Sequence, residues 1–342
     1  MKTPLSVRTF LAALSFGVFA LPAAAQNAEK EFFRGKTIRV VVGSGTGGGY
    51  DIFARLIAPY LGRALDAVAV VENQPGAGGI TSLNRLYAAP PDGLTMSFAN
   101  GTSAAFAQIT DQPGLRFDLA KFGYLATVGA PPGLWLLKAD TPYRSVKDIV
   151  AANRTWHWAA SGPTDGLGNG AAFTCAALKL ECKIVTGYTG SNQAALAVTK
   201  GEMDAVYIPE SSANNFVKAG QNFALATMAR HKSRFFQDRP TIFESADLDA
   251  DGVWLFDFLG GVESLGRILI LPPNMPAARL AYLQAVTKEV LHDPQLIAEG
   301  ERVERIIEYL DPGSTLKNAL AVVANVTPEQ KKRVQALVSR EK

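Results

Sequence analysis

The sequence is poor in the residues that build metal centres, and it has no strong excess of charge. Its 342 residues include two cysteines and three histidines (His157, His231 and His292), without an H-x-x-x-H or C-x-x-C spacing. We therefore expect no metal site. The formal net charge is only +3, and the basic cluster Lys331-Lys332-Arg333 is typical of one solvated helix face. This composition argues against a nucleic-acid partner.

The first 25 residues have the layout of a secretory signal. Lys2 and Arg8 form a basic start, an apolar core runs from Phe10 to Leu21, and three alanines ending at Ala25 precede the expected cleavage point. The apolar core is shorter than the roughly 20 residues that span a bilayer. We therefore expect an exported protein without a membrane anchor. Cleavage would remove two bases and no acid, which lowers the formal charge to +1.

Cys175 and Cys182 lie seven residues apart. In an oxidising compartment such a pair can close a local disulfide between a helix end and the next strand. Two separate buried thiols are the alternative, because a sequence does not reveal the Cα separation that a disulfide requires. Both interpretations stay open at this point.

Short apolar runs alternate with helical patterns along the chain, which predicts an α/β fold with parallel strand pairing. The first series of strands is expected at residues 38–42, 67–73 and 94–100, and the second at residues 133–140, 155–160, 183–188 and 203–208. Within the second series, Ser145 and Asp148 form a predicted capping box. Two series indicate two lobes. We expect residues 26–127 and 229–342 in the first lobe and residues 128–228 in the second.

A glycine-rich stretch, GSGTGGGYD from Gly43 to Asp51, separates the first predicted strand from a helix. It fits the dinucleotide fingerprint G-x-G-x-x-G, but an exported protein rarely meets free NAD. The underlying physics remains: free N–H groups at a helix start attract a small anion such as a carboxylate. A merely tight turn is the alternative for the loop. Asp51 either contacts a donor of the ligand or orders the loop, or it only stabilises the first helical turn.

A second glycine-rich stretch, NQPGAGG from Asn73 to Gly79, follows the next predicted strand. Loops at the carboxyl ends of neighbouring parallel strands face one crevice, so the two sets of amides can hold one carboxylate without an arginine. We therefore expect Gly47→Val or Gly78→Val to abolish binding while the fold persists.

The second lobe offers two further loops between a strand and a helix, residues 161–170 and 187–192. The hydroxyls of Ser161, Thr164 and Thr189 can donate to a distal ligand oxygen. In addition, Asn169 can donate or accept, and Asp165 can accept from a polar or ammonium group. The alternative is that Ser161, Thr164 and Asp165 only cap the following helix.

Several of these stretches together resemble the Bug-type (TctC-like) substrate-binding proteins of tripartite tricarboxylate transporters. The resemblance rests on GSGTGGGYDIFARLIAPYLGR, VVENQPGAGGITSLNRLYAAPPDG, SVKDIVAA, SGPTDGLGNGAAF, GYTGSNQAALAVTKGEMDAV and PTIFE, and it covers most of residues 31–245. Beyond residue 245 the family's usual pattern is altered to VWLFDFLGGVESLGRILILPPNMP. Asp165 and Asn169 also depart from the family's second-lobe loop.

The resemblance implies a type II-like periplasmic binding protein with two α/β lobes, each a mostly parallel sheet flanked by helices. Such a protein closes on an organic acid (a di-, tri- or aromatic carboxylate) and passes it to membrane permease subunits. Residues expected at the site from the first lobe are Ser44, Thr46, Gly47, Gly48, Asp51, Asn73, Gly76, Ala77 and Gly78. Residues expected from the second lobe are Ser161, Gly162, Thr164, Asp165, Asn169, Thr189 and Asp204. Asp204, in GEMDAV, either orients the distal half of the ligand or is satisfied by neighbouring loop amides.

Two other functions use the same sequence features. A ligand-binding sensor component would present a carboxylate from the same cleft to a signalling partner. An exported hydrolase would need a nucleophile and a base, yet the chain has no G-x-S-x-G elbow and its histidines lie outside the glycine loops. We therefore expect a monomeric, cofactor-free binding protein rather than an enzyme.

Overall fold

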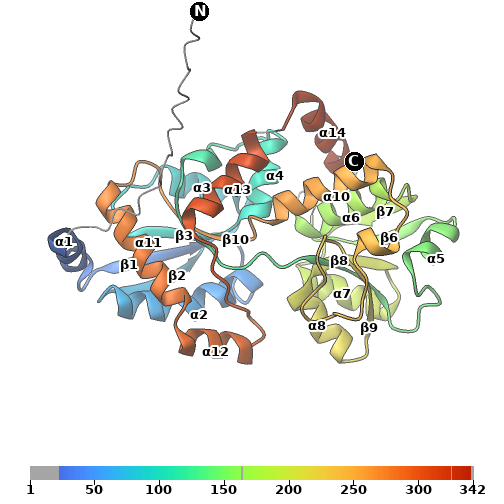
Figure 1. Cartoon of the computed structure of the whole chain (residues 1–342), viewed down its shortest axis with the longest axis horizontal. Coiled ribbons are helices and arrows are strands. Elements are labelled where there is room, and N and C mark those ends of the chain that lie inside the picture. Colours follow the sequence, from blue (N-terminus) through green and yellow to red (C-terminus); the bar gives the residue numbers. More distant parts are fainter. Residues whose placement is uncertain (1–22, 163–164, 325, 340–342) are drawn as a thin grey trace, which may run out of the picture.

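The computed structural model describes residues 23–162, 165–324 and 326–339. Its elements form two groups, each built on a five-stranded sheet, which lie side by side in Figure 1. The first sheet has the strand order β2-β1-β3-β10-β4, and the second has the order β7-β6-β8-β5-β9. The predicted α/β fold with two lobes of sheet and helices is confirmed. Most of the predicted signal, residues 1–22, lies outside the described residues.

The strands and helices have the following bounds. The first sheet contains β1 (Thr37–Val42), β2 (Val68–Asn73), β3 (Thr95–Asn100), β4 (Gly123–Thr127) and β10 (Arg267–Leu271), and the second contains β5 (Gly133–Lys138), β6 (Trp156–Ala159), β7 (Cys182–Val185), β8 (Ala205–Pro209) and β9 (Asn222–Thr227). The helices are α1 (Ala23–Phe33), α2 (Gly49–Ala64), η1 (Ala77–Gly79), α3 (Ile80–Tyr87), α4 (Gly101–Ile109), η2 (Leu119–Lys121), α5 (Val146–Ala151), α6 (Gly166–Ala177), α7 (Ser191–Lys200), α8 (Glu210–Lys218), α9 (Ile242–Ser245), α10 (Ala250–Glu263), α11 (Ala277–Leu291), α12 (Pro294–Arg302), α13 (Pro312–Ala324) and α14 (Pro328–Val338). Among the described helices, none is long and apolar enough to cross a membrane.

Each sheet contains one reversed strand. In the first sheet β1 pairs in parallel with β2 and β3, whereas β10 runs antiparallel to β3 and β4. In the second sheet β6 pairs in parallel with β7 and β8, whereas β5 runs antiparallel to β8 and β9. The reversal brings the first residue of β10 and of β5 to the edge where the other strands end.

Local sequence signals explain where several helices begin. The predicted capping box is present, because Ser145 Oγ accepts from the Asp148 N–H and Asp148 Oδ2 accepts from the Ser145 N–H, at 3.2 and 2.9 Å. Helix α2 differs, because its N-cap residue Gly48 has no side chain to accept from the first turn. The amino end of α2 therefore keeps unpaired N–H groups and a partial positive charge.

The contacts of residues 228–263 bear on where the chain returns from the second group to the first. A β-bridge joins Thr227 to Thr241, and α9 packs on α5 and β9, so residues beyond 228 still contact the second sheet. Helix α10 then packs on α6 and also on α4 and α13, before β10 enters the first sheet. The division into lobes at residues 127 and 228 stays a prediction, and these contacts favour a return through α10.

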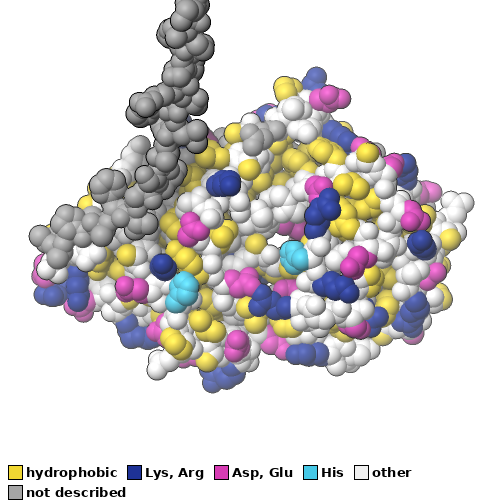
Figure 2. Space-filling model, viewed as in Figure 1, with side chains coloured by type: hydrophobic (Ala, Val, Ile, Leu, Met, Phe, Trp, Pro, Cys, Tyr) yellow, Lys and Arg dark blue, Asp and Glu magenta, His cyan; other side chains and the backbone are white. Residues whose placement is uncertain are grey.

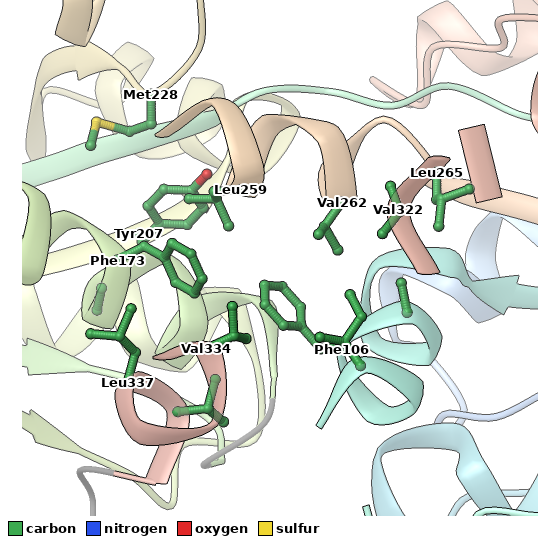
Figure 3. Packing of buried hydrophobic residues seen from close by; sticks show 14 of the residues in the cluster. Phe106, Phe173, Tyr207, Met228, Leu259, Val262, Leu265, Val322, Val334 and Leu337 are labelled. Carbon is green, nitrogen blue, oxygen red and sulfur yellow. The ribbon is translucent and has the colours of Figure 1, made fainter. Parts of the chain in front are cut away.

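One hydrophobic cluster is shared by both groups. Phe106 of α4 and Phe173 of α6 approach edge to face with their ring centroids 5.7 Å apart. Leu259 and Val262 of α10 belong to the same buried cluster, as do side chains of α13 and α14. Figure 3 shows these side chains converging from both sides. Two further clusters lie within the individual groups.

Cys175 and Cys182 form a disulfide, with their Cα atoms 6.2 Å apart. The bridge joins the last turns of α6 to the first residue of β7. Of the two interpretations that the sequence left open, the structure shows the local bridge.

Candidate functional site

A cavity of about 710 Å³ lies at the edges where the two sheets face each other. The first sheet contributes the loop after β1, Asn100 at the end of β3 and Arg267 at the start of β10. The second sheet contributes the loop after β6 and Pro209 at the end of β8. The carboxyl ends of parallel strands and the starts of the reversed strands thus supply its walls, as is usual for ligand sites in α/β sheets.

The first wall is the glycine loop after β1. The described residues that line the cavity include four of its predicted site residues, Ser44, Thr46, Gly47 and Gly48. Gly47 has φ of +79°, a conformation that glycine adopts readily and other residues rarely. Ser44 Oγ is buried without a hydrogen-bond partner among the described residues. The backbone of this loop and the amino end of α2 therefore form one wall of the cavity.

The side chain of Asp51 holds this loop in its conformation through a hydrogen bond. Its side chain is 2% exposed, and its Oδ2 accepts from the Gly47 N–H at 2.8 Å and from Arg55 Nε at 3.0 Å. Although burial alone raises the pKa of Asp51, the hydrogen bonds from Arg55, Gly47 and Asn73 lower it below its ordinary value. Asp51 is absent from the described lining of the cavity. Among the roles weighed for Asp51, the structure shows the ordering of the loop.

Asn73 connects the first loop to the second. Its side-chain amide donates to the Ser44 carbonyl at 3.0 Å, and its Oδ1 accepts from Arg55 Nη2 at 2.9 Å and from Thr46 Oγ1 at 3.3 Å. The predicted site residues Gly76, Ala77 and Gly78 are not part of the described cavity lining. Their strand, β2, is the outer strand of the first sheet, and the loop after it lies beside the first loop, where the backbones of Gly43 and Gly79 approach closely. The direct contact expected from these three residues stays a prediction.

The second sheet places Ser161, Asp165 and Thr189 at the cavity. Asp165 is the N-cap of α6, and its two carboxylate oxygens accept from the Gly168 and Ser161 N–H groups at 2.8 and 3.1 Å. Burial raises the pKa of Asp165 against these hydrogen bonds. The capping role that the sequence offered as an alternative is thus present, and the residue also faces the cavity.

The other second-lobe predictions have different outcomes. Gly162 is described but does not contribute to the described lining, and Asn169 is buried inside α6 rather than at the cavity. Thr164 lies outside the described residues. Asp204 precedes β8 and therefore lies at the opposite end of that strand from Pro209.

Asp204 is paired at that far edge. Its Oδ2 accepts from the His157 N–H at 2.8 Å, and the carboxylate forms an ion pair with Arg154. The predicted orienting of the ligand's distal half is corrected, because the structure does not bring Asp204 to the cavity. Neighbouring groups satisfy the acid instead, which was the alternative interpretation.

Several lining residues were not predicted from the sequence. Tyr207 Oη donates to Glu263 Oε1 at 2.6 Å, and burial raises the pKa of Glu263 to about 7. Two basic side chains, Arg267 and Arg305, also line the cavity. Both Glu263 and Arg267 belong to the segment where the family pattern is altered. The sequence signal that could have indicated them is a charged residue directly before the apolar run ILIL, Arg267, and a second one four residues earlier, Glu263.

The exposed charges follow no single sign on the face that Figure 2 shows, where basic and acidic side chains are interspersed. Among the described residues, no three His, Cys, Asp or Glu side chains gather closely enough to hold a metal ion. The chemistry that the cavity offers comes from amides, hydroxyls, two arginines and two carboxyls. Such a set can bind a small anion by hydrogen bonds and charge.

Comparison with known proteins identifies the class. Residues 53–295 match the model of the family described as "Tripartite tricarboxylate transporter family receptor". The chain belongs to this family. A UPF0065 protein of Bordetella pertussis is 25% identical over 282 residues, covering 81% of this chain and 83% of that protein. Protein BugT of the same organism is 22% identical over 233 residues, covering 67% and 72% of the two chains.

Solved structures share the fold. MatC from Rhodopseudomonas palustris, with bound malate, has a TM-score of 0.68 at 22% identity, covering 89% of this chain and 99% of that chain. A second R. palustris protein, with adipate, has a TM-score of 0.69 at 17% identity, covering 89% and 97%. The periplasmic binding protein BugD has a TM-score of 0.67 at 18% identity, covering 88% and 97%. At these identities the likeness establishes the fold, which is the two-lobed fold that the sequence predicted.

Proposed function

We propose that this protein is a periplasmic solute receptor that captures a small organic acid in the cavity between its two sheets. The observation that carries the proposal is the glycine loop after β1, which turns the amino end of α2 and a set of backbone amides toward the cavity. Such an arrangement favours a carboxylate. Membership of a transporter receptor family supports a binding role rather than an enzymatic one.

The ligand contacts that we propose follow from the geometry. Ser44, Thr46, Gly47 and Gly48 line the first wall, where the first turn of α2 offers its backbone N–H groups. Across the cavity, the hydroxyls of Ser161 and Thr189 and the carboxylate of Asp165 are the contacts of the second wall. Asp51 and Asn73 act indirectly by holding the first loop. The malate bound to one structural neighbour and the adipate with another support a carboxylate as the ligand class.

The first test is the melting temperature of the purified mature protein against a panel of compounds. The panel contains mono-, di- and tricarboxylates, aromatic acids, acidic amino acids, neutral sugars and NAD. A ligand at 100 times its dissociation constant adds about 2.7 kcal/mol to the free energy of unfolding, which raises the melting temperature by several degrees. We expect a rise confined to some of the acids. A rise only with sugars or NAD, or none at all, would contradict the proposal.

Delivery to the permease subunits of a tripartite tricarboxylate transporter is the second part of the proposal. Uptake of the labelled acid should fall when the gene is deleted and recover when it is restored. Unchanged uptake, combined with an altered transcriptional response to the acid, would favour the sensor role. Monomeric behaviour is expected by light scattering with and without ligand, since each chain holds a complete cavity.

A further inference from the structure

Two arginine side chains line the cavity without a carboxylate partner. Among the described residues, no carboxylate oxygen lies within 4.0 Å of a nitrogen of Arg267 or Arg305 that would form an ion pair. Arg305 Nε is buried without any hydrogen-bond partner among the described residues. The hydrogen bond given for its side chain runs from Nη1 to the carbonyl of the preceding residue, at 3.2 Å.

The acidic side chains near these arginines form ion pairs with other basic residues. Glu210 and Glu308 both form ion pairs with Arg234, and Glu304 pairs with Lys218 at 3.4 Å. Placing two like charges together in a partly buried site is unfavourable. Burial lowers the pKa of Arg267 most, and the nearby charge of Arg305 lowers it further, whereas Tyr50 and Glu210 raise it. Counted with the glutamates that Arg234 and Lys218 pair, the two arginines leave a net positive charge that a bound anion would neutralise.

The guanidinium of Arg267 is held in place by an aromatic ring. Its Cζ atom lies 4.4 Å from the ring centroid of Phe53, a side chain of α2 that is buried. Stacking on a ring face leaves the edges of a guanidinium free, and those edges donate the paired hydrogen bonds that match a carboxylate. Because Arg267 is the first residue of the reversed strand β10, the fold directs it to the same edge as the glycine loop.

We propose that Arg267 and Arg305 together bind a second anionic group of the ligand and thereby select a dicarboxylate over a monocarboxylate. The inference rests on the proposed function, because it assumes that the glycine loop holds the first carboxylate. The cavity then has two anion-binding regions of different kinds. One uses neutral backbone amides and a helix end, and the other uses two charged guanidinium groups.

The experiment compares acids of equal length that differ in one carboxylate. Isothermal titration calorimetry is carried out on the mature protein with succinate and butyrate, adipate and hexanoate, and phthalate and benzoate. We expect at least one diacid to bind about 100-fold more tightly than its monoacid. Arg305→Gln and Arg267→Gln should each weaken binding of that diacid by about 10- to 100-fold, as expected for loss of charge-assisted hydrogen bonds. The same variants should change monoacid affinity less than about threefold.

Two further variants make the test specific. Arg302→Gln removes the same charge from the exposed last turn of α12, three residues before Arg305, and should leave all affinities within about twofold. Arg305→Lys keeps the charge but loses the paired geometry, so its diacid affinity should lie between those of the wild type and Arg305→Gln. Because Arg305 lies in a loop, Arg305→Gln still tests the proposal if Arg267→Gln disturbs β10.

The outcomes separate the two proposals. If a monoacid binds as tightly as its diacid, or if Arg305→Gln weakens both equally, the selection of a dicarboxylate is wrong while the carboxylate receptor stands. If the wild-type protein binds none of the acids in these pairs or in the larger panel, both proposals fail.

Discussion

The two glycine loops of the first sheet look alike in sequence but occupy different places. Each follows a parallel strand and precedes a helix, and each contains at least one glycine with positive φ. Only the loop after β1 lines the cavity, because β1 lies inside the sheet while β2 forms its edge. We therefore expect strand order, rather than the glycine pattern, to decide which loop meets a ligand directly.

The largest effect should come from Gly47→Val. Valine is strongly disfavoured at φ of +79°, so the loop must change its backbone conformation at the cavity wall. No heavy atom lies within 4 Å of an added Cβ, so we expect the fold to persist. Calorimetry with the acid found in the panel should show at least a 100-fold loss of affinity. Gly49→Ala, at a helical position with equal space, is the control and should bind within about threefold of the wild type.

Asp51→Asn should weaken binding by about tenfold. The substitution removes the charge that holds the Gly47 N–H and Arg55, and a hydrogen bond to a charged group contributes about 1.5–3 kcal/mol. The pKa of Asp51 is lowered in the folded protein, so its contribution to stability is present above its unfolded pKa and is lost as the pH falls through the folded pKa. Urea unfolding at pH 7 and pH 3 should therefore show a smaller difference between variant and wild type at pH 3. An equal difference at both pH values would contradict this role.

Glu263 lies on the opposite side of the cavity from the glycine loop, and its charge should change the ligand affinity less than the substitution of Asp51 does. Its pKa of about 7 means that the carboxyl is neutral at pH 6 and charged at pH 8. The charged Glu263 carboxylate repels an anionic ligand, so the affinity for the acid should fall about three- to tenfold between pH 6 and pH 8. Glu263→Gln should abolish this dependence.

The assignment to Glu263 depends on the neighbouring titratable groups. The pKa of Tyr207 is raised well above 10 by burial, so it does not titrate in this range. Asp165 is also a cavity carboxyl with a pKa raised by burial. If Glu263→Gln keeps the full pH dependence and Asp165→Asn removes it, Asp165 is the responsible group.

Gly78→Val should have the smallest effect on binding, less than about threefold. Gly78 has φ of +64°, so the backbone strain is similar to that at Gly47, and an added Cβ again meets no heavy atom within 4 Å. The two substitutions thus form a matched pair that differs mainly in distance from the cavity. Abolished binding in Gly78→Val would restore the equal roles that the sequence predicted for the two loops.

Much of the fold could be predicted from the sequence, because it depends on patterns that are local. Apolar runs such as IRVVV mark strands, and the pair Ser145 and Asp148 marks a helix start. The lobe boundaries were harder to place. Helix α10 is apolar on several sides because it packs against both groups, and nothing in its sequence says which sheet it follows.

The site was predicted only where it follows parallel strands. Ser44, Thr46 and Ser161 were found in this way, whereas Asp204 was misplaced because it lies before its strand rather than after it. Arg267 was missed because β10 is reversed, which brings a strand's first residue to the cavity. Strand direction depends on long-range pairing, so the sequence pattern does not reveal it.

The shared hydrophobic cluster in Figure 3 has a consequence for the free energy of capturing a ligand. Helices α4, α6, α10 and α14 pack into one core behind the cavity, so wide separation of the two groups would expose buried aromatic and aliphatic side chains to water. We therefore expect a binding-competent arrangement to be a major state of the free protein. Little affinity should then be lost to a conformational pre-equilibrium, and association rates should rise linearly with ligand concentration without reaching a plateau.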